Sequence, residues 1–168
     1  MSEWNTAPRF THLLTHSSMK KSASKVDRVE VWTDGCFNKR LCGWAVVCPS
    51  QKLILRGKIL GGTNQRAELL AIVHALQYFG SDLIVNTDSK YSIGCLDGGW
   101  NPTKNLEIIQ MGLDLGSTKV EYRHVFGHSG DTYNEMADGF CNGKLLSDSL
   151  KSEGWKVKEC EDDELIGM

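Results

Sequence analysis

Four acidic residues stand out in this sequence because of the elements on which they are expected to lie. Asp34 and Asp88 each follow a short apolar segment, and Glu68 and Asp138 lie beside apolar residues of predicted helices. A carboxylate in such a place is costly to desolvate unless something neutralises it. Because no thiolate pair or histidine pair accompanies them, these oxygen donors favour Mg²⁺ or Mn²⁺ over zinc. Two such ions can hold the attacking and leaving oxygens of an in-line phosphoryl displacement, so the implied chemistry is phosphodiester hydrolysis.

Taken one at a time, each of these acids has a simpler interpretation. Asp34 precedes a glycine, which is typical of a turn, and Asp88 precedes a serine, which is typical of a helix cap. Glu68 can be a solvated acid that complements the helix dipole, and Asp138 can be an exposed helical residue. Only the joint placement of the four favours a metal site.

A histidine in a loop of small residues supplies a candidate acid or base. His128 lies in the segment Gly127-His128-Ser129-Gly130, and its near-neutral unperturbed pKa suits proton transfer to a leaving oxygen. The simpler alternative is an exposed loop histidine without a chemical role. The other histidines, His12, His16, His74 and His124, lack comparable surroundings.

Hydrophobic periodicity predicts the elements that must position these residues. The first strand is expected to end in a turn at Asp34 and Gly35, and a helix capped by Thr63 and Asn64 is expected to end at Gly80. An antiparallel hairpin unit extended by parallel strands through helical crossovers makes the class α/β with a mixed sheet. The other expected elements are strands at 43–48, 53–60, 83–85 and 120–126, and helices at 89–96, 105–115 and 133–150, with a loop at 127–132.

Composition limits the classes of protein to consider. The chain has 168 residues, of which 40% are hydrophobic and 24% are charged, and this is ordinary for one folded domain. The net charge of −2 produces no global positive field that would draw the chain onto nucleic acid or a membrane. No apolar run approaches the roughly 18 residues of a membrane helix. The six cysteines form no CxxC pair or zinc spacing, and no secretory signal is visible. Free thiols and an intracellular, cytoplasmic location are therefore expected.

Charge divides the chain into three parts. Residues 1–25 have a net charge of +3 and are expected to form a flexible N-terminal arm, either without a role or weakly attracted to phosphates. Residues 26–150 are expected to form the catalytic domain. Residues 151–168 have a net charge of −3 and are expected to form a frayed acidic tail.

Four motifs together resemble type 1 ribonuclease H over about residues 28–146. They are Thr33-Asp34-Gly35, the segment 63–69, the segment 86–91, and the segment 127–130 followed by Asn134, Glu135 and Asp138. The resemblance implies a ribonuclease H-like fold, with a five-stranded mixed sheet of three antiparallel and two parallel strands flanked by helices. It also implies Mg²⁺-dependent endonucleolytic cleavage of the RNA strand of an RNA/DNA hybrid, leaving 5′-phosphate and 3′-hydroxyl ends.

The resemblance also assigns roles to residues. It makes Asp34, Glu68, Asp88 and Asp138 the ligands of two Mg²⁺ ions, for which Mn²⁺ can substitute. It makes His128 a residue that assists proton transfer and product release without binding metal.

Substrate binding is assigned in the same way. The backbone around Gly35 and Cys36 and the side chains of Asn64 and Gln65 are expected to face consecutive 2′-hydroxyls of the RNA. Thr63 is expected to help hold a phosphate of the DNA strand.

Three departures from the family pattern are visible. Cys36 stands where the family often has serine, and the loop at 37–41 is shorter than in bacterial members. The segment 98–104 replaces a Trp/Lys-rich basic protrusion that many members carry, so binding is expected to be weaker and more salt-sensitive. No separate N-terminal hybrid-binding domain is expected.

The expected partner is thus an RNA/DNA hybrid, with no membrane and no protein partner, and the protein is expected to be a monomer. Two other functions remain open. One is a nucleic-acid-binding domain that kept the fold and lost catalysis. The other is a different metal-dependent nuclease of the same architecture, such as a resolvase or an exonuclease.

Overall fold

The structure is a computed structural model that describes residues 27–116 and 119–161. The predicted arm at 1–25 and the last residues of the predicted tail, 162–168, lie outside the described residues. The strands are β1 (Val29–Asn38), β2 (Leu41–Cys48), β3 (Leu53–Leu60), β4 (Leu83–Thr87), β5 (Glu121–His124) and β6 (Lys156–Glu159). The helices are α2 (Asn64–Phe79), α3 (Lys90–Leu96), α4 (Leu106–Gly116), α5 (Thr132–Cys141) and α6 (Asp148–Ser152), with a 3-10 turn, η1 (Pro49–Gln51).

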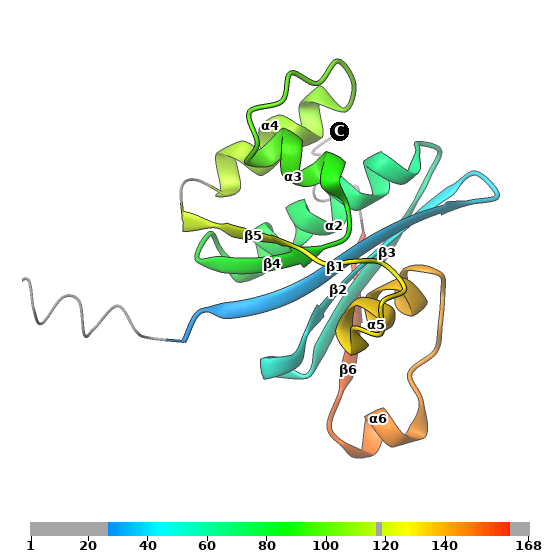
Figure 1. The fold of residues 1–168 in the computed structure, drawn as a ribbon. Coiled ribbons are helices and arrows are strands. Elements are labelled where there is room, and N and C mark those ends of the chain that lie inside the picture. The colour runs from blue at the N-terminus through cyan, green and yellow to red at the C-terminus, as the bar shows by residue number, and fades with distance from the viewer. Residues whose placement is uncertain (1–26, 117–118, 162–168) are drawn as a thin grey trace, which may run out of the picture.

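The strands form one six-stranded sheet in the order β5-β4-β1-β2-β3-β6 (Figure 1). Strand β2 is antiparallel to both β1 and β3, while β4 is parallel to both β1 and β5. The predicted α/β class and mixed sheet are therefore confirmed. The sheet has one strand more than the five expected, because β6 adds parallel to β3.

Helices cover both faces of the sheet, and alternate residues of strand β2 pack against the helices on opposite faces. Trp44 and Val46 belong to the core formed with α2 and α4, whereas Ala45 and Val47 belong to the core formed with α5. This alternation is the two-residue period of a strand buried on both sides. In Figure 1, α2, α3 and α4 lie on one side of the sheet and α5 and α6 on the other.

Helix α2 begins and ends where its sequence predicts. The Thr63 hydroxyl accepts a hydrogen bond from the Arg66 backbone N–H at 3.2 Å, which satisfies one of the free amides of the first turn. Gly80 ends the helix at a φ of 88°, in the left-handed region that favours glycine.

The turn predicted at Asp34 and Gly35 is wrong. Strand β1 continues through both residues to Asn38. The glycine serves a different purpose, because a Cβ at position 35 would lie 2.3 Å from the Ala67 carbonyl carbon and from the Glu68 backbone nitrogen. Gly35 thus allows helix α2 to approach strand β1 closely, which no other residue type permits.

The single helix predicted at 133–150 is also wrong, since the structure has two shorter helices there. Helix α5 ends at Cys141, and Gly143 follows with a φ of 91°. Helix α6 begins after Ser147, whose side chain accepts a hydrogen bond from the Leu150 backbone N–H at 3.2 Å. The glycine in the left-handed region breaks what periodicity alone reads as one helix.

The acidic tail predicted from residue 151 is wrong for residues 151–161, which belong to the fold. Residues 156–159 form strand β6, and Trp155, at 8% exposure, packs with Tyr133 in the core under α5. The Arg56 guanidinium pairs with the Glu159 carboxylate at 2.6 Å. A charged edge strand of four residues has little hydrophobic periodicity, which explains why its sequence resembles a tail. Within the described residues, no helix is both long enough and apolar enough to cross a membrane.

Candidate active site

Two of the four predicted acids meet because they follow paired residues on neighbouring strands. Strands β1 and β4 are parallel, and their register pairs Thr33 with Thr87. The next residue along each strand is an aspartate, so Asp34 and Asp88 come to the same edge of the pair. Asp34 is only 5% exposed, although it is charged in an ordinary aqueous setting.

Glu68 joins this pair from helix α2. The close approach at Gly35 places the second turn of the helix over the end of the two aspartates, and the Gly35 N–H donates to Asp34 Oδ1 at 2.9 Å. One carboxylate oxygen from each of Asp34, Glu68 and Asp88 lies within 4.8 Å of the others. The three acids therefore converge as expected.

Asp138 approaches from the opposite face of the sheet, on helix α5. Ligand atoms of Asp34, Asp138 and Cys141 also lie within 4.8 Å of one another. The Asn142 side-chain amide donates to Asp138 Oδ1 at 3.3 Å and to the Asp138 carbonyl at 2.9 Å, which orients that carboxylate. Asp34 is common to both groups, so it links Asp138 on one side to Glu68 and Asp88 on the other.

Burial and the neighbouring acids raise the pKa of Asp34 and of Glu68. Burial, together with the nearby charge of Asp88, raises the pKa of Asp34 to about 7. Burial and the charges of Asp34 and Asp88 raise the pKa of Glu68 to about 10. Desolvation and like charges both disfavour the ionised form, so the cluster is electrostatically unsatisfied by itself.

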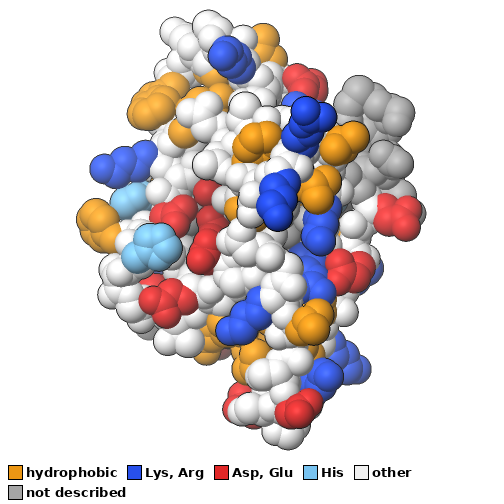
Figure 2. Space-filling model, turned by 90° about the vertical axis from the view of Figure 1, so that its right-hand side faces the viewer, with side chains coloured by type: hydrophobic (Ala, Val, Ile, Leu, Met, Phe, Trp, Pro, Cys, Tyr) orange, Lys and Arg blue, Asp and Glu red, His pale blue; other side chains and the backbone are white. Residues whose placement is uncertain are grey.

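The surroundings do not relieve this charge. Within residues 27–116 and 119–161, no lysine or arginine forms an ion pair with any of the four acids. Glu68 Oε2 is buried and has no hydrogen-bond partner in the described structure. Figure 2 shows acidic side chains gathered on one face, with histidine side chains beside them. An orphaned carboxylate oxygen among repelling acids fits a divalent cation, as hard oxygen ligands prefer Mg²⁺ or Mn²⁺.

Cys141 was not singled out from the sequence, although its sulfur lies in the second group. Its Sγ donates to Asp34 Oδ2 at 3.9 Å and to the Asp138 carbonyl at 3.1 Å. The hydrogen bond with Cys36 and burial hold the pKa of Cys141 well above its ordinary value, while the same hydrogen bond lowers the pKa of Cys36 to about 7. Cys141 is therefore a neutral thiol that donates to the Asp34 carboxylate and to the Asp138 backbone carbonyl, and carboxylate oxygens suit a hard cation better than this sulfur does.

His128 lies in the loop between β5 and α5, close to the acids through its neighbour. A Cβ on Gly127 would lie 3.0 Å from Asp88 Oδ2, so the loop passes directly over that carboxylate. His128 itself is exposed and has a φ of 55°, and Ser129 Oγ donates to the Phe126 carbonyl at 2.6 Å. The loop holds an exposed imidazole next to the acidic cluster.

The predicted substrate-binding residues fall into two groups. Thr63, Asn64 and Gln65 are exposed at the start of helix α2, one turn before Glu68. Cys36 lies on β1, half-buried, two residues beyond Asp34, and its Sγ donates to the Cys141 carbonyl at 3.1 Å. Gly35 packs against α2 and presents only backbone.

Sequence reasoning missed Cys141, Asn142, Lys39 and Lys58. The first two lie three and four residues after Asp138, which is the spacing of one helix face, so that signal was present in the sequence. The pairing of β1, β2 and β3 brings the two lysines to a pocket that Cys141 and Asn142 also line, and nothing in their local sequence indicates it.

Comparison with known proteins decides the family. The model of the RNase H family matches residues 26–145, well over half of the chain. The chain belongs to the ribonuclease H family. This confirms the predicted resemblance and the enzyme class that it implies, a ribonuclease H.

Individual relatives agree with the family match. The ribonuclease H of Verminephrobacter eiseniae is 34% identical over 141 residues, which cover 70% of this chain and 90% of that protein. The ribonuclease H of Bordetella avium is 32% identical over 150 residues, covering 77% of this chain and 97% of that protein. The ribonuclease H of Gluconobacter oxydans is 34% identical over 140 residues, which cover 71% of this chain and 93% of that protein.

Proposed function

We propose that this protein is an endonuclease that cleaves the RNA strand of RNA/DNA hybrids with two divalent cations and leaves 5′-phosphate and 3′-hydroxyl ends. One observation carries the proposal: Asp34 belongs to both groups of converging ligands. Two ions that share a ligand lie close enough to act on the two sides of one phosphodiester. Mg²⁺ is the proposed ion, with Mn²⁺ as a substitute, because the ligands are carboxylates.

The proposed ligands are Asp34, Glu68, Asp88 and Asp138. Bound ions would supply an activated water and would stabilise negative charge on the leaving oxygen. The carboxylates must be ionised to hold them, so binding displaces the protons that the raised pKa values of Asp34 and Glu68 retain. Asn142 orients the Asp138 carboxylate for this task.

His128 is proposed to assist proton transfer and product release. Its loop passes over Asp88, and its side chain is exposed, so it can approach the leaving group without a place among the ligands. An imidazole exchanges protons near neutral pH.

Recognition of RNA is proposed to come from the groups that flank the acids. Cys36 and the backbone at Gly35 lie on one side, and Thr63, Asn64 and Gln65 lie on the other. Hydroxyl and amide groups in these positions can bond to the 2′-hydroxyls that distinguish RNA from DNA.

The test compares substrates. The purified protein with Mg²⁺ should cut the labelled RNA strand of a hybrid and should leave duplex DNA, single-stranded RNA and four-way junctions intact. End mapping should find 5′-phosphates. Hybrid binding without cleavage would favour a domain that has lost catalysis, and cleavage of junctions or single strands would favour another nuclease of this architecture.

We further propose that the protein acts as a monomer in the cytoplasm. All of the proposed site residues come from one chain, so the chemistry needs no second copy. The six cysteines are thiols, which is the state that a reducing compartment maintains.

A further inference from the structure

A pocket adjoins the acidic cluster, and none of the four proposed metal ligands lines it. Its volume is about 180 Å³, and its walls come from the β1–β2 hairpin, strand β3 and the end of helix α5. The residues that matter here are Cys36, Lys39, Lys58, Cys141 and Asn142. A water molecule occupies roughly 30 Å³ in the liquid, so the pocket is large enough for a phosphate group.

The pocket shares a wall with the acidic cluster. Cys141, in this wall, donates to Asp34 Oδ2, and Asn142 donates to Asp138 Oδ1. A group held in the pocket would therefore lie next to a group held by the acids.

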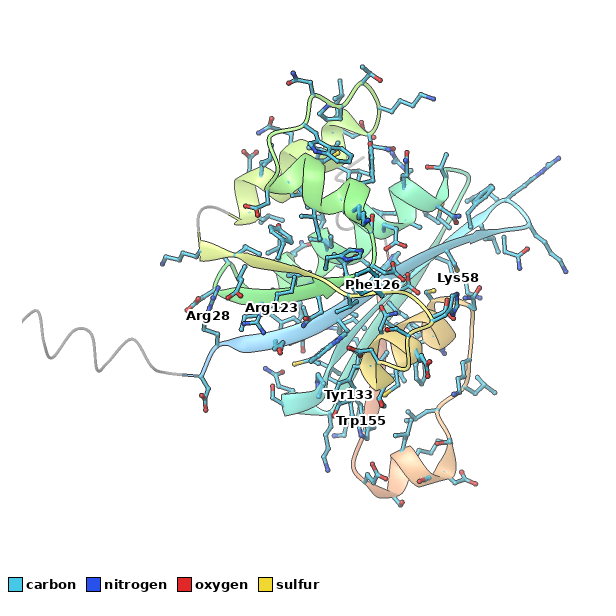
Figure 3. The ribbon with its side chains drawn as sticks, viewed as in Figure 1. Arg28, Lys58, Arg123, Phe126, Tyr133 and Trp155 are labelled. Carbon is cyan, nitrogen blue, oxygen red and sulfur yellow. The ribbon has the colours of Figure 1, made fainter. Side chains whose placement is uncertain are left out.

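The cations of the pocket have no anionic partner among the residues that the structure describes. Lys39 and Lys58 are both exposed, and neither forms an ion pair with a carboxylate in the described part of the chain. Figure 2 shows a band of lysine and arginine side chains beside the acidic group, and Figure 3 shows Lys58 at the end of the sheet that carries the acids. Unpaired cations next to a phosphodiester-cleaving centre are suited to hold phosphate.

The hairpin places Lys39 there at a conformational cost. Asn38 pairs with Leu41, so Lys39 and Arg40 form a two-residue loop, with φ values of 48° and 67°. Such a loop strongly favours glycine, which has no Cβ to clash at positive φ, and asparagine, whose short polar side chain can hydrogen-bond locally. The needs of the turn therefore do not explain why Lys39 and Arg40 occupy it. Residues whose backbone conformation is unfavourable for their type often mark a functional position.

We propose that this pocket holds a backbone phosphate of the cleaved RNA strand, adjacent to the phosphate that is cut. The inference rests on the proposed function. The Lys39 and Lys58 ammonium groups would neutralise the phosphate, and Asn142 would place it next to the metal-bound phosphodiester. The strand is the RNA because the pocket and the acids share a wall, so neighbouring phosphates of one strand can occupy both.

The first experiment neutralises one cation. Lys58→Gln should raise KM for a hybrid by about three- to tenfold, leave kcat within about twofold, and reduce the slope of log KM against log salt by about 1. The control is Lys156→Gln, an exposed lysine on β6 that pairs with Leu53 at the opposite end of β3 from Lys58, and it should change none of these.

The strand is identified with a neutral linkage. A single methylphosphonate next to the preferred cut in the RNA should raise the wild-type KM, and it should add nothing to the effect of Lys58→Gln. A methylphosphonate in the DNA strand should leave the effect of Lys58→Gln unchanged. The proposal is wrong if the effect of Lys58→Gln on KM disappears only with the methylphosphonate in the DNA strand. It is also wrong if Lys58→Gln has the KM of the wild type.

A second experiment separates binding from folding. Lys39→Asn should relieve the strained turn and raise Tm by about 2 °C, yet it should raise KM. Lys52→Asn is the matched control, because Lys52 has a φ of 49° in the turn at the opposite end of β2. It should not change KM. An unchanged KM for Lys39→Asn would overturn the role of the hairpin.

Failure of the proposed function has a different signature. If the wild-type protein cuts no hybrid, the catalytic proposal fails by itself. If the wild-type protein cuts the hybrid, and Lys58→Gln changes neither KM nor its salt dependence, the catalytic proposal stands. The proposal that the pocket binds phosphate is then refuted.

Discussion

Replacing Glu68 with glutamine should stabilise the protein when no metal is present. Glu68 is packed against Asp34 and Asp88, and its Oε2 has no hydrogen-bond partner in the described structure. The pKa of Glu68 is raised from 4.5 to about 10, chiefly by burial. Since the folded state binds a proton that the unfolded state has lost, stability falls as the pH rises between these two values. Glutamine has nearly the same shape and needs no proton.

The size of the effect follows from that difference. At about pH 8, folding requires Glu68 to take up a proton, and this lowers the free energy of unfolding by roughly 4 to 5 kcal/mol. Each tenfold change in an equilibrium is worth about 1.4 kcal/mol. The amide must still be desolvated, so we expect Glu68→Gln to gain about 3 kcal/mol. For a chain of this size that gain raises Tm by about 9 °C, whereas at about pH 5 the gain should be about 2 °C or less.

The assay is thermal unfolding in a chelator at both pH values and again with saturating Mg²⁺. In the proposed site the metal is held by the Glu68 carboxylate, so Mg²⁺ should abolish or reverse the advantage of the variant. Glu135→Gln, on the exposed side of α5, is the control and should change stability by no more than about 0.5 kcal/mol. A Glu68→Gln protein that is less stable than wild type at pH 8, or that gains equally at both pH values, would refute the electrostatic reasoning.

Three further predictions concern the elements that position the acids. Gly35→Ala puts a Cβ 2.3 Å from backbone atoms of α2, so it should cost about 3 kcal/mol and lower Tm by about 9 °C; an unchanged Tm by calorimetry would contradict this packing. Trp155→Ala empties a site that is 8% exposed and should cost about 3 kcal/mol, with faster amide hydrogen exchange across β6; exchange confined to other strands would be inconsistent with its role. Asp131→Ala removes the side chain that accepts from the Tyr133 and Asn134 backbone N–H groups at 3.1 and 3.0 Å, so denaturant unfolding should show a loss of about 1 kcal/mol.

Strongly periodic parts of the fold could be predicted from the sequence. Helix α2 carries an apolar face between a threonine cap and a terminating glycine, and each of these signals is local. The meeting of Asp34 and Asp88 could be predicted because each aspartate ends an apolar segment, and parallel neighbours bring such ends together.

Features that depend on tertiary contacts could not be predicted in this way. Gly35 resembles a turn residue, and only the approach of α2 reveals that it is needed for packing. Strand β6 has charged residues at three of its four positions and is held by Trp155 and by pairing with β3, so its own sequence indicates a tail. Lys58 reaches the pocket beside the acidic cluster through the register of three strands, and local periodicity carries no information about register.

The central claim is that acids distant in the chain converge to bind catalytic metal ions. Its most direct test is the single-turnover rate of RNA cleavage in a labelled hybrid, at saturating Mg²⁺, for Asp88→Asn beside Asp114→Asn. Asp114 is an exposed residue of α4 that accepts a hydrogen bond from Gln110 at 2.8 Å and belongs to neither group of converging ligands. With both variants shown to be folded, Asp88→Asn should lose about a thousandfold or more in rate while Asp114→Asn matches wild type. Cleavage by Asp88→Asn within about tenfold of the wild-type rate would contradict the claim.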